Sequence, residues 1–260
     1  MDTWRGKWAL VTGASAGIGG ELARILAAGG TNLVLTARRK DRMEQLATEL
    51  ASRHGIRAEV FVADLAQSSA PEEIFAFTEG KGIAVDLLIN NAGFGAYGEF
   101  CEIPLGRQLE MTQVNVSAVV HLTHLYLPQM IARRRGDVLI VASTAAFQAV
   151  PYISAYAATK AFDLLFAEGL AEEMKPYGIR VCALCPGSTR TEFHQVANQP
   201  ERLLRFIETA EKVARVGLEG LVAGKSCVIS GFANNLSIFG ERFASRRLVT
   251  RAAGQMFKPR

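Results

Sequence analysis

The amino-acid sequence predicts a single α/β domain, residues 1–260, in which a doubly wound, mostly parallel sheet of about seven strands carries helices on both faces. Short apolar runs rich in Val, Ile and Leu alternate with segments of helical periodicity, as in buried parallel strands joined by crossover helices. A glycine-rich turn links the first apolar run to the first helical segment. With 260 residues, 49% of them hydrophobic, the chain can bury one large core. These observations predict a Rossmann-type fold.

Seven apolar runs are the predicted strands, and their lengths are those of strands rather than of helices. Right-handed crossovers between parallel strands bring the carboxyl ends together at one edge of the sheet, where ligands bind in this architecture. Gly13, Asn91, Ser143 and Gly187 lie at or just after such ends. The runs are residues 8–11, 32–37, 58–63, 86–89, 137–143, 180–185 and 226–230.

The glycine-rich turn, Thr12 to Gly19, follows the first strand and opens a helix. Gly13 permits the tight turn, Gly17 lacks the Cβ that would block a pyrophosphate, and Gly19 lets the helix pack close to the sheet. Unpaired backbone N–H groups and the positive end of the helix dipole would bind the pyrophosphate. Such a turn alone is a weak signal, and its spacing differs from the commoner G-x-G-x-x-G, but the strand-turn-helix context favours dinucleotide binding.

Tyr156 and Lys160 stand four positions apart in a helix-favouring stretch, so both side chains leave the same face one turn apart. A free phenol has a pKa of about 10. A nearby ammonium lowers that pKa toward neutrality, which would let Tyr156 exchange a proton with a carbonyl oxygen. Ser143 ends the fifth predicted strand, where its hydroxyl could bond the same oxygen. Taken singly, each has a plainer explanation: a packing tyrosine, a solvated lysine and a turn serine.

The order of these motifs resembles that of a classical short-chain dehydrogenase/reductase over nearly the whole chain. The resemblance implies a nicotinamide-dependent oxidoreductase in which Asn115, Ser143, Tyr156 and Lys160 are catalytic. In that family the asparagine holds a water of the proton relay, and the lysine also binds the nicotinamide ribose. The motifs are Thr12-Gly13-x-x-x-Gly17-x-Gly19, Asn90-Asn91-Ala92-Gly93, Asn115, Ser143, Tyr156-x-x-x-Lys160 and Pro186-Gly187.

The resemblance also implies which residues hold the cofactor. Asp64 would contact the adenine, and the segment 90–93 would support the sheet near the adenine ribose. Pro186, Gly187 and Thr191 would line the nicotinamide. The expected cofactor-binding residues are Gly13, Ser15, Gly17, Ile18, Gly19, Arg38, Asp64, Asn91, Ala92, Gly93, Asn115, Tyr156, Lys160, Pro186, Gly187 and Thr191.

The end of the second strand indicates which nicotinamide cofactor the site takes. NAD-preferring folds place an acidic residue there for the ribose hydroxyls, whereas an arginine accommodates the 2′-phosphate of NADP. This chain has Arg38, Arg39 and Lys40 there and no acid. We predict that NADP(H) is favoured over NAD(H), with Arg38 and Ser15 binding the phosphate. The plainer explanation is that Arg39 and Lys40 only begin the next helix.

Aromatic residues just after the motif positions indicate an apolar or aromatic carbonyl substrate. Phe94, Phe147 and Phe193 are the candidates for the pocket wall, with Ser143 and Tyr156 at the reacting oxygen. Ordinary packing of loop aromatics is the alternative for each of them. Further aromatic residues in the same regions are Tyr97, Phe100 and Tyr152.

The substrate itself is not determined by the sequence. Residues 194–215 match the family's variable substrate lid, and Arg202, Arg205 and Lys212 within it could meet the phosphopantetheine of an acyl thioester or lie on a solvated helix face. Reduction of 3-oxoacyl thioesters and a general carbonyl or steroid-type activity therefore both remain open. The alternative from another class is a catalytically silent NADP-binding regulator or scaffold. Loss of Tyr156 or Lys160 would have favoured it, and both are present.

Composition argues against several other classes. The net charge of +4 gives no general case for nucleic-acid binding. His121 and His124 have no acid or thiol partner at metal-ligand spacing, so no metal is expected. Cys182 and Cys185 fall on opposite faces of a strand and are expected to be buried thiols, which indicates a reducing, cytoplasmic location. No signal peptide precedes the first strand, and no run approaches the ~20 apolar residues that span a bilayer.

The C-terminal tail, residues 241–260, contains six cations and one acid. As a helix it would place Leu248, Val249, Ala252 and Met256 on one face. We expect this stripe to pack on its own subunit or on a neighbouring subunit of a homodimer or homotetramer. Peripheral contact with an anionic membrane is the less favoured alternative. The expected substrate partner is a small carbonyl or alcohol compound.

Overall fold

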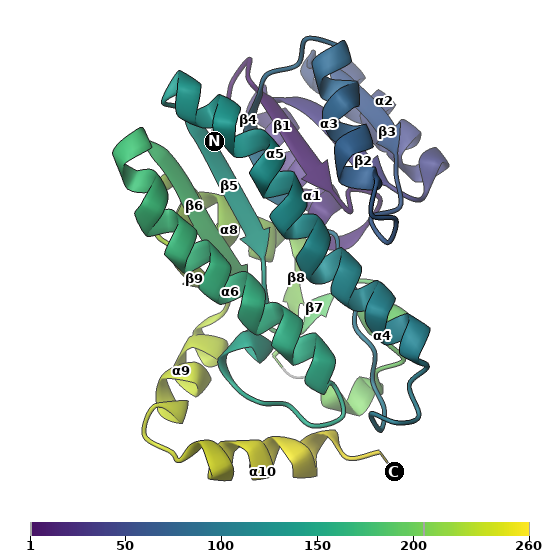
Figure 1. The fold of residues 1–260 in the computed structure, drawn as a ribbon, viewed down its shortest axis with the longest axis vertical. Coiled ribbons are helices and arrows are strands. Elements are labelled where there is room, and N and C mark those ends of the chain that lie inside the picture. Colours follow the sequence, from purple (N-terminus) through teal and green to yellow (C-terminus); the bar gives the residue numbers. More distant parts are fainter. Residues whose placement is uncertain (1, 205, 260) are drawn as a thin grey trace.

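The computed structural model describes residues 2–204 and 206–259. Its centre is a parallel sheet with the strand order β3-β2-β1-β4-β5-β6-β9 (Figure 1). The winding reverses between β1 and β4, where doubly wound sheets bind ligands. The predicted mostly parallel sheet of about seven strands is confirmed. The strands are β1 (Trp8–Thr12), β2 (Asn32–Ala37), β3 (Ala58–Val62), β4 (Val85–Asn90), β5 (Gly136–Val141), β6 (Ile179–Cys185) and β9 (Cys227–Ile229).

Helices cover both faces of this sheet, so it has a separate hydrophobic core on each side (Figure 1). Those on one face are α1 (Gly17–Ala28), α2 (Lys40–His54) and α8 (Ala210–Val222). Those on the other are α3 (Ala70–Gly80), α5 (Ala118–Arg133) and α6 (Ser154–Met174). Strands buried on both faces account for the unbroken apolar runs of the sequence.

The two neighbouring thiols of β6 belong to different cores. Cys182 packs with the core under α1 and α8, and Cys185 packs with the core under α5 and α6. Residues three apart on a strand point to opposite faces. The prediction of two buried thiols on opposite sides of the sheet is therefore confirmed, and both are free cysteines.

The carboxyl ends of the strands carry the shorter elements around the site. β5 ends at Val141, so the predicted strand 137–143 is two residues too long. The chain leaves the sheet because Ser143 opens a 3₁₀ turn, in which its hydroxyl accepts a hydrogen bond from the backbone N–H of Ala145 at 3.1 Å. Other short elements are α4 (Leu105–Thr112), a π-helical turn (Gln113–Ser117) and 3₁₀ turns at Thr144–Phe147, Lys175–Tyr177 and Glu201–Leu203.

The chain between β6 and β9 divides into two parts. β7 (Thr189–Arg190) pairs with β8 (Glu208–Thr209) in a separate two-stranded sheet, and α7 (Phe193–Val196) lies between them. The predicted lid, residues 194–215, crosses this division. Its first part includes cavity-lining residues, whereas residues 210–215 begin α8, which covers the sheet.

After β9 the chain forms α9 (Phe232–Glu241) and α10 (Arg246–Phe257), which cross the lower end of the molecule in Figure 1. The tail is helical, but the expected apolar stripe is not its packed face. Ala253 is buried, whereas Leu248 is 60% and Met256 is 37% exposed. The small residues Ala253 and Gly254 let the helix approach Pro151 more closely than the larger side chains would. Packing of the stripe on its own subunit is therefore wrong for Leu248 and Met256.

Across the described parts of the chain, no helix combines the length and apolar character needed to cross a bilayer. The same residues contain no group of three or more His, Cys, Asp or Glu side chains arranged to hold a metal ion.

Candidate active site

Tyr156, Lys160 and Ser143 line one cavity of about 440 Å³. Tyr156 and Lys160 lie one turn apart on α6, and Ser143 follows β5. The Ser143 hydroxyl lies near enough to the Tyr156 phenol to lower its pKa. The ring of Phe193 packs against the Tyr156 ring, with centroids 5.3 Å apart. The structure thus brings Ser143, which follows β5, to the same cavity as the two motif side chains of α6.

The Tyr156 phenol is buried, and burial raises its pKa above the ordinary value of 10.0. The Lys160 charge and the nearby Ser143 hydroxyl lower this pKa, whereas the Asp163 carboxylate raises it. The expected shift toward neutrality is not found, because loss of hydration around the phenol outweighs the charge of the lysine. Tyr156 is held as a neutral phenol, which is the form that donates a proton.

Lys160 is also buried, and its ammonium has two partners. Nζ donates to the backbone carbonyl of Val141 at 2.7 Å and to Oδ2 of Asp163 at 2.9 Å. Burial lowers the pKa of this ammonium, but Asp163 and Tyr156 raise it, and the net shift is upward. Asp163 was missed from the sequence because it lies outside the Y-x-x-x-K motif. Its position three residues after Lys160, on the same helix face, is the signal that could have found it.

Asn115 lies in the π-helical turn between α4 and α5, a feature frequent at functional sites. Its Oδ1 accepts from the backbone N–H of Phe94 at 3.1 Å, and its Nδ2 donates to the Phe94 carbonyl and to the Thr159 hydroxyl, both at 3.0 Å. Both amide hydrogens are therefore used, and Oδ1 keeps one lone pair for a further donor. The side chain is fully buried and does not line the cavity, although it lies beside it under Gly93.

The glycine-rich turn is fixed by close contacts that only glycine permits. Gly13 and Gly17 have φ values of +67° and +57°, a region that side chains rarely adopt. A Cβ on Gly19 would overlap the side-chain amide of Asn91 and would lie 2.5 Å from the Gly13 carbonyl oxygen. Asn91 in turn donates to the Thr12 carbonyl at 2.7 Å and so ties the end of β4 to the end of β1.

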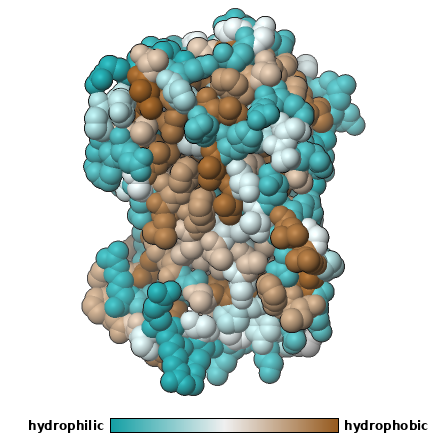
Figure 2. All heavy atoms as spheres, viewed as in Figure 1, coloured by the Kyte–Doolittle hydropathy of each residue, from teal (hydrophilic) through white to brown (hydrophobic). Residues whose placement is uncertain are grey.

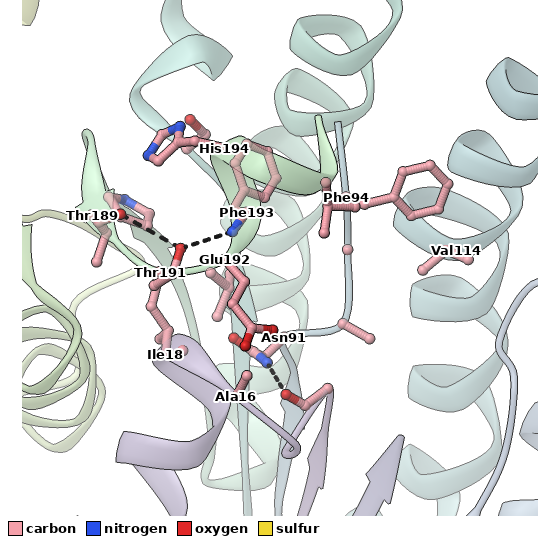
Figure 3. A pocket seen from close by; sticks show the side chains of 18 of the residues that line it. Ala16, Ile18, Asn91, Phe94, Val114, Thr189, Thr191, Glu192, Phe193 and His194 are labelled. Carbon is pink, nitrogen blue, oxygen red and sulfur yellow. Dashed lines mark hydrogen bonds between the residues drawn. The ribbon is translucent and has the colours of Figure 1, made fainter. Parts of the chain in front are cut away.

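The amino terminus of α1 fits the pyrophosphate of a dinucleotide. Ala16 at the N-cap provides no side-chain hydrogen bond, and the first turn contains no acid, so the first N–H groups of the helix have no side-chain acceptor. Thr191 lies over this turn, its Cγ2 at 3.0 Å from where a Gly17 Cβ would be. Figure 3 shows Thr191 between Thr189 and Phe193, to which it is hydrogen-bonded.

The other expected cofactor-binding residues also surround the cavity. All sixteen line it except Gly19 and Asn115, which lie behind the lining. Those not yet described are Ser15, Ile18, Arg38, Asp64, Ala92, Gly93, Pro186 and Gly187.

Two arginines after β2 line the cavity edge. Arg38 is more than half exposed, and its guanidinium lies 3.6 Å from Glu110. Arg39 donates twice to the Ser15 hydroxyl, at 3.1 and 3.0 Å, and once to Glu192 at 2.5 Å. Arg39 is the exposed N-cap of α2, as the plainer interpretation expects, and its side chain also folds back onto the glycine-rich turn. Its position beside Ser15 is a tertiary contact that the sequence does not encode locally.

Two of the three aromatic candidates line the cavity. Figure 3 shows Phe94 and Val114 on one side and Phe193 on the other. Phe94 is buried, with the Arg107 guanidinium 3.8 Å from its ring centroid. Phe147 is not among the lining residues: the 3₁₀ turn after Ser143 directs it onto the hydrophobic core.

The other three aromatic residues also lie outside this cavity. The Tyr97 hydroxyl donates to the Phe257 carbonyl at 2.8 Å. Phe100 and Tyr152 border a second, much smaller cavity.

Several apolar lining residues were missed from the sequence. They come from segments far apart in the chain and carry no motif, so only the fold assembles them. They are Val114, Ile153, Val196, Leu203 and Phe257.

The two lid cations that the structure describes do not line the cavity. Arg202 donates to the Lys258 carbonyl at 2.8 Å and to the Met256 carbonyl at 3.4 Å, and so holds the end of α10. Lys212 pairs with Glu208 at 2.7 Å at the start of α8. Neither is among the lining residues. Arg205, the third candidate, lies outside the described residues.

A family model described as short chain dehydrogenase matches residues 7–202. The chain belongs to this family. Short-chain dehydrogenases are oxidoreductases that bind a nicotinamide cofactor and act on CH–OH groups of small molecules.

Other short-chain dehydrogenases resemble it along much of the chain. The very-long-chain 3-oxoacyl-CoA reductase of Phaeosphaeria nodorum is 35% identical over 181 residues, 68% of this chain and 53% of the reductase. The 7beta-hydroxysteroid dehydrogenase of Collinsella aerofaciens is 31% identical over 239 residues, 90% of this chain and 89% of that enzyme. The very-long-chain reductases are matched over only 53 to 64% of their length.

A solved structure, the short-chain dehydrogenase of Sphingobium yanoikuyae in complex with NADPH, superposes with a TM-score of 0.82. It is 28% identical in sequence, and the match covers 98% of this chain and 96% of that chain. The similarity therefore extends past the residues that the family model matches.

Proposed function

We propose that this short-chain dehydrogenase uses NADPH to reduce the carbonyl group of an apolar ketone or aldehyde, and that it oxidises the corresponding alcohol in reverse. One observation supports this most strongly. A buried tyrosine one turn from Lys160 shares with Ser143 a cavity whose other walls are a glycine-rich turn and apolar side chains.

The reaction needs a hydride, which bound NADPH would supply to the carbonyl carbon. The protein's own residues manage the oxygen. Tyr156 donates its proton to the developing alkoxide as general acid, and the Ser143 hydroxyl donates a hydrogen bond to the same oxygen. The Lys160 ammonium stabilises the phenolate that remains. In the reverse direction the phenolate of Tyr156 accepts the proton of the alcohol.

The preference for NADPH is supported by the chemistry at the end of β2. No acid stands there to bind a free ribose diol, and Arg38, Arg39 and the Ser15 hydroxyl line the cavity edge. Both arginines are paired with glutamates at partly exposed positions. Such pairs contribute little free energy, so a phosphate can replace the carboxylate. A bidentate contact to phosphate is stronger than the pairs it displaces.

The proposed substrate is a compact apolar or aromatic ketone rather than an acyl thioester. Neither of the two described lid cations lines the cavity: Arg202 is bonded to the end of α10, and Lys212 lies at the start of α8 beside Glu208. The cavity wall is formed instead by Phe94, Phe193 and the apolar residues described above. Hydroxysteroids are in this class, and one relative is named a hydroxysteroid dehydrogenase.

The substrate class is tested by following NADPH oxidation with aromatic ketones, steroid ketones and 3-oxoacyl thioesters in parallel. We expect turnover with the first two classes and at least ~10-fold lower kcat/KM with the thioesters. Preference for thioesters would contradict the substrate proposal but leave the reductase activity intact. NADPH binding without turnover on any carbonyl would support the silent regulator instead.

A homo-oligomer is the assembly that we propose, and a surface over α4, α5 and α6 favours it. Figure 2 shows hydrophobic side chains gathered along the middle of this face. The large ones that are exposed are Leu105, Leu109, Val120, Phe162 and Leu165. Charges of both signs, such as Arg107 and Glu110, accompany them, as a self-complementary surface requires. Light scattering of the full chain measures the mass of the assembly.

Four free thiols among the described residues support a reducing compartment such as the cytoplasm.

A further inference from the structure

α9 and the turn after it present an apolar stripe to solvent. Phe232, Leu236, Phe239 and Phe243 follow at helical spacing, with exposed fractions of 83%, 60%, 54% and 79%. The rings of Phe239 and Phe243 pack edge to face, with centroids 5.3 Å apart. Single exposed apolar residues are ordinary, but four large ones in succession along α9 and the turn after it mark an interaction surface.

α10 extends this surface. Leu248 and Met256 are exposed on its outer side, and with the four residues of α9 they form what we call the tail surface. The inner side of α10 is held in place, because Ala253 is buried and the Phe257 carbonyl accepts from Tyr97. The Ser245 hydroxyl caps its amino terminus, accepting from the Leu248 N–H at 3.3 Å. The outer side is therefore a defined face of the molecule.

The charge around the tail surface has one sign. Residues 232–258 contain five cations, Arg242, Arg246, Arg247, Arg251 and Lys258, and one acid, Glu241. Burial raises the pKa of Glu241 above its ordinary value. Within residues 2–204 and 206–259, none of the five cations forms an ion pair. Hydrophilic side chains project at the lower end of the molecule in Figure 2, where α10 lies.

The excess of positive charge around the tail surface indicates which kind of partner it binds. In a two-fold dimer the same patch lies on both subunits, so a contact through the tail surface would bring five cations against five. The surface over α4 to α6, with its mixed charges, has no such conflict. Large apolar side chains beside arginines on a short helix pair are instead typical of helices that lie in the interface of an anionic membrane.

We propose that the tail surface docks on an anionic lipid bilayer. Phe232, Phe239 and Phe243 would enter the boundary between headgroups and acyl chains, and the arginines would contact lipid phosphates. Phe257, at the end of the same helix pair, lines the cavity. Docking would therefore place the cavity next to the bilayer, in which apolar compounds are concentrated.

Sedimentation with vesicles tests this proposal on the full chain. We expect binding to phosphatidylcholine mixed with phosphatidylglycerol, little binding to phosphatidylcholine alone, and loss of binding at high salt. The double variant Phe239→Ser/Phe243→Ser should lower partitioning at least ~10-fold. Arg246→Glu/Arg247→Glu should lower partitioning by a similar factor. The helix should still form, because acidic residues are favourable in the first turn of α10. The matched control is Phe206→Ser/Ile207→Ser, at positions exposed by 63% and 49% outside both the tail surface and the surface over α4 to α6, which should bind lipid like the parent.

Two results would overturn the proposal. One is equal binding of the parent and the Phe239→Ser/Phe243→Ser variant to the anionic vesicles. The other is a change in oligomer mass of that variant, measured by light scattering without lipid, since the tail surface would then be a contact between copies of this chain. Because every substituted side chain is largely exposed, unchanged melting temperatures are expected and show that folding is not the cause.

A separate observation concerns Asp163 beneath the catalytic lysine. Its side chain is buried, its Oδ2 lies 2.9 Å from Lys160 Nζ, and its Oδ1 has no hydrogen-bond partner among the described residues. A buried carboxylate is costly unless its charge is matched. Lys160 has three N–H donors, of which the Val141 carbonyl and Asp163 take two.

We infer that Asp163 is a positioning residue, which directs the third N–H of Lys160 toward the cavity and cancels part of the lysine's charge at Tyr156. The groups that face Lys160 from neighbouring elements are Asn115, which does not titrate, and Cys185 of β6. Asp163 is thus the acid that balances the ammonium. This inference rests on the proposed oxidoreductase activity.

The pH profile of kcat/KM tests the role of Asp163. Asp163→Asn keeps the shape and removes the negative charge, which lowers the pKa of Tyr156. The upper pH limb of ketone reduction should therefore move to lower pH by about one unit. Asp163→Glu keeps the charge and should keep the limb at the parental pH, with a lower kcat because the ammonium is displaced.

A purely structural role of Asp163 would lower the melting temperature of the Asn variant and leave its limb unmoved, which would overturn the inference. If Asp163→Asn does not fold, the test rests on Asp163→Glu. A shift in the upper pH limb of kcat/KM for Asp163→Glu would contradict the inference. A parent without turnover on any carbonyl would overturn the proposed function as well, whereas an active parent with an unmoved limb overturns only this inference.

Discussion

The proposed catalytic residues on α6 and the tail surface on α9 and α10 differ in how their side chains are surrounded. Tyr156 and Lys160 are buried, and the Lys160 ammonium donates to the Val141 carbonyl and to Asp163. Phe232 and Phe243 are apolar and more than three quarters exposed. The first region is complete within one chain, because a buried charge without partners would not be tolerated. The apolar side chains of the second region are not covered by the chain itself, which indicates that a partner outside the chain covers them.

The largest expected effect concerns the complete region. Tyr156→Phe removes the proton donor and keeps the ring against Phe193, so turnover should fall at least ~100-fold. NADPH binding should be retained. Single-turnover hydride transfer measures the chemical step. Tyr177→Phe, at a partly exposed tyrosine away from the cavity, is the control and should match the parent. Hydride transfer at the parental rate in Tyr156→Phe would show that another group supplies the proton.

The glycine-rich turn should be nearly as sensitive. Gly19→Ala places a Cβ against the Asn91 amide and the Gly13 carbonyl, so we expect a loss of ~1–3 kcal/mol in the free energy of unfolding and loss of cofactor binding. Gly20→Ala is the matched control, because its Cβ would lie 3.6 Å from the Ala14 carbonyl oxygen, an ordinary contact. It should be neutral or slightly stabilising. Equal denaturation midpoints for the two variants would contradict this account.

A smaller effect is expected at the cofactor end of the cavity. Arg38→Asp replaces a phosphate-binding cation by a carboxylate that suits a ribose diol, so the affinity for NADPH should fall at least ~10-fold more than that for NADH. Fluorescence titration with both cofactors measures the difference. Lys40→Asp is the control, since Lys40 pairs with Glu44 and does not line the cavity. If Arg39→Asp discriminates and Arg38→Asp does not, the arginine beside Ser15 is the one that recognises the phosphate.

The smallest effect concerns the tail. Ending the chain after Glu241 removes α10, in which Ala253 is the buried residue. We expect a loss of about 1 kcal/mol, or a melting temperature lower by roughly 2–4 °C. NADPH binding should be retained, and the cavity should lose its contact with Phe257. Global unfolding of the truncated chain would show that the tail belongs to the core rather than to the surface.

The sequence alone determined those parts of the molecule whose signal is local. Seven apolar runs specified the sheet, because a strand buried on both faces must be apolar throughout. Gly13, Asn91 and Ser143 follow the carboxyl ends of predicted parallel strands, which placed them at one edge of the sheet. The four-residue spacing of Tyr156 and Lys160 was enough to place them on one helix face, because helical geometry relates such positions without reference to the rest of the fold.

Only the tertiary structure decided which of several chemically similar residues line the cavity or contact its other residues. Arg39 rather than Arg38 bonds Ser15, Phe147 packs in the core while Phe94 lines the cavity, and Asp163 lies under Lys160. The pKa of Tyr156 depends on burial, which spacing does not report. Helical periodicity gave the tail its two faces, but the choice between them followed from Ala253 and Gly254 meeting the rest of the fold. Periodicity fixes which residues share a face, whereas contacts between distant segments decide which face is buried.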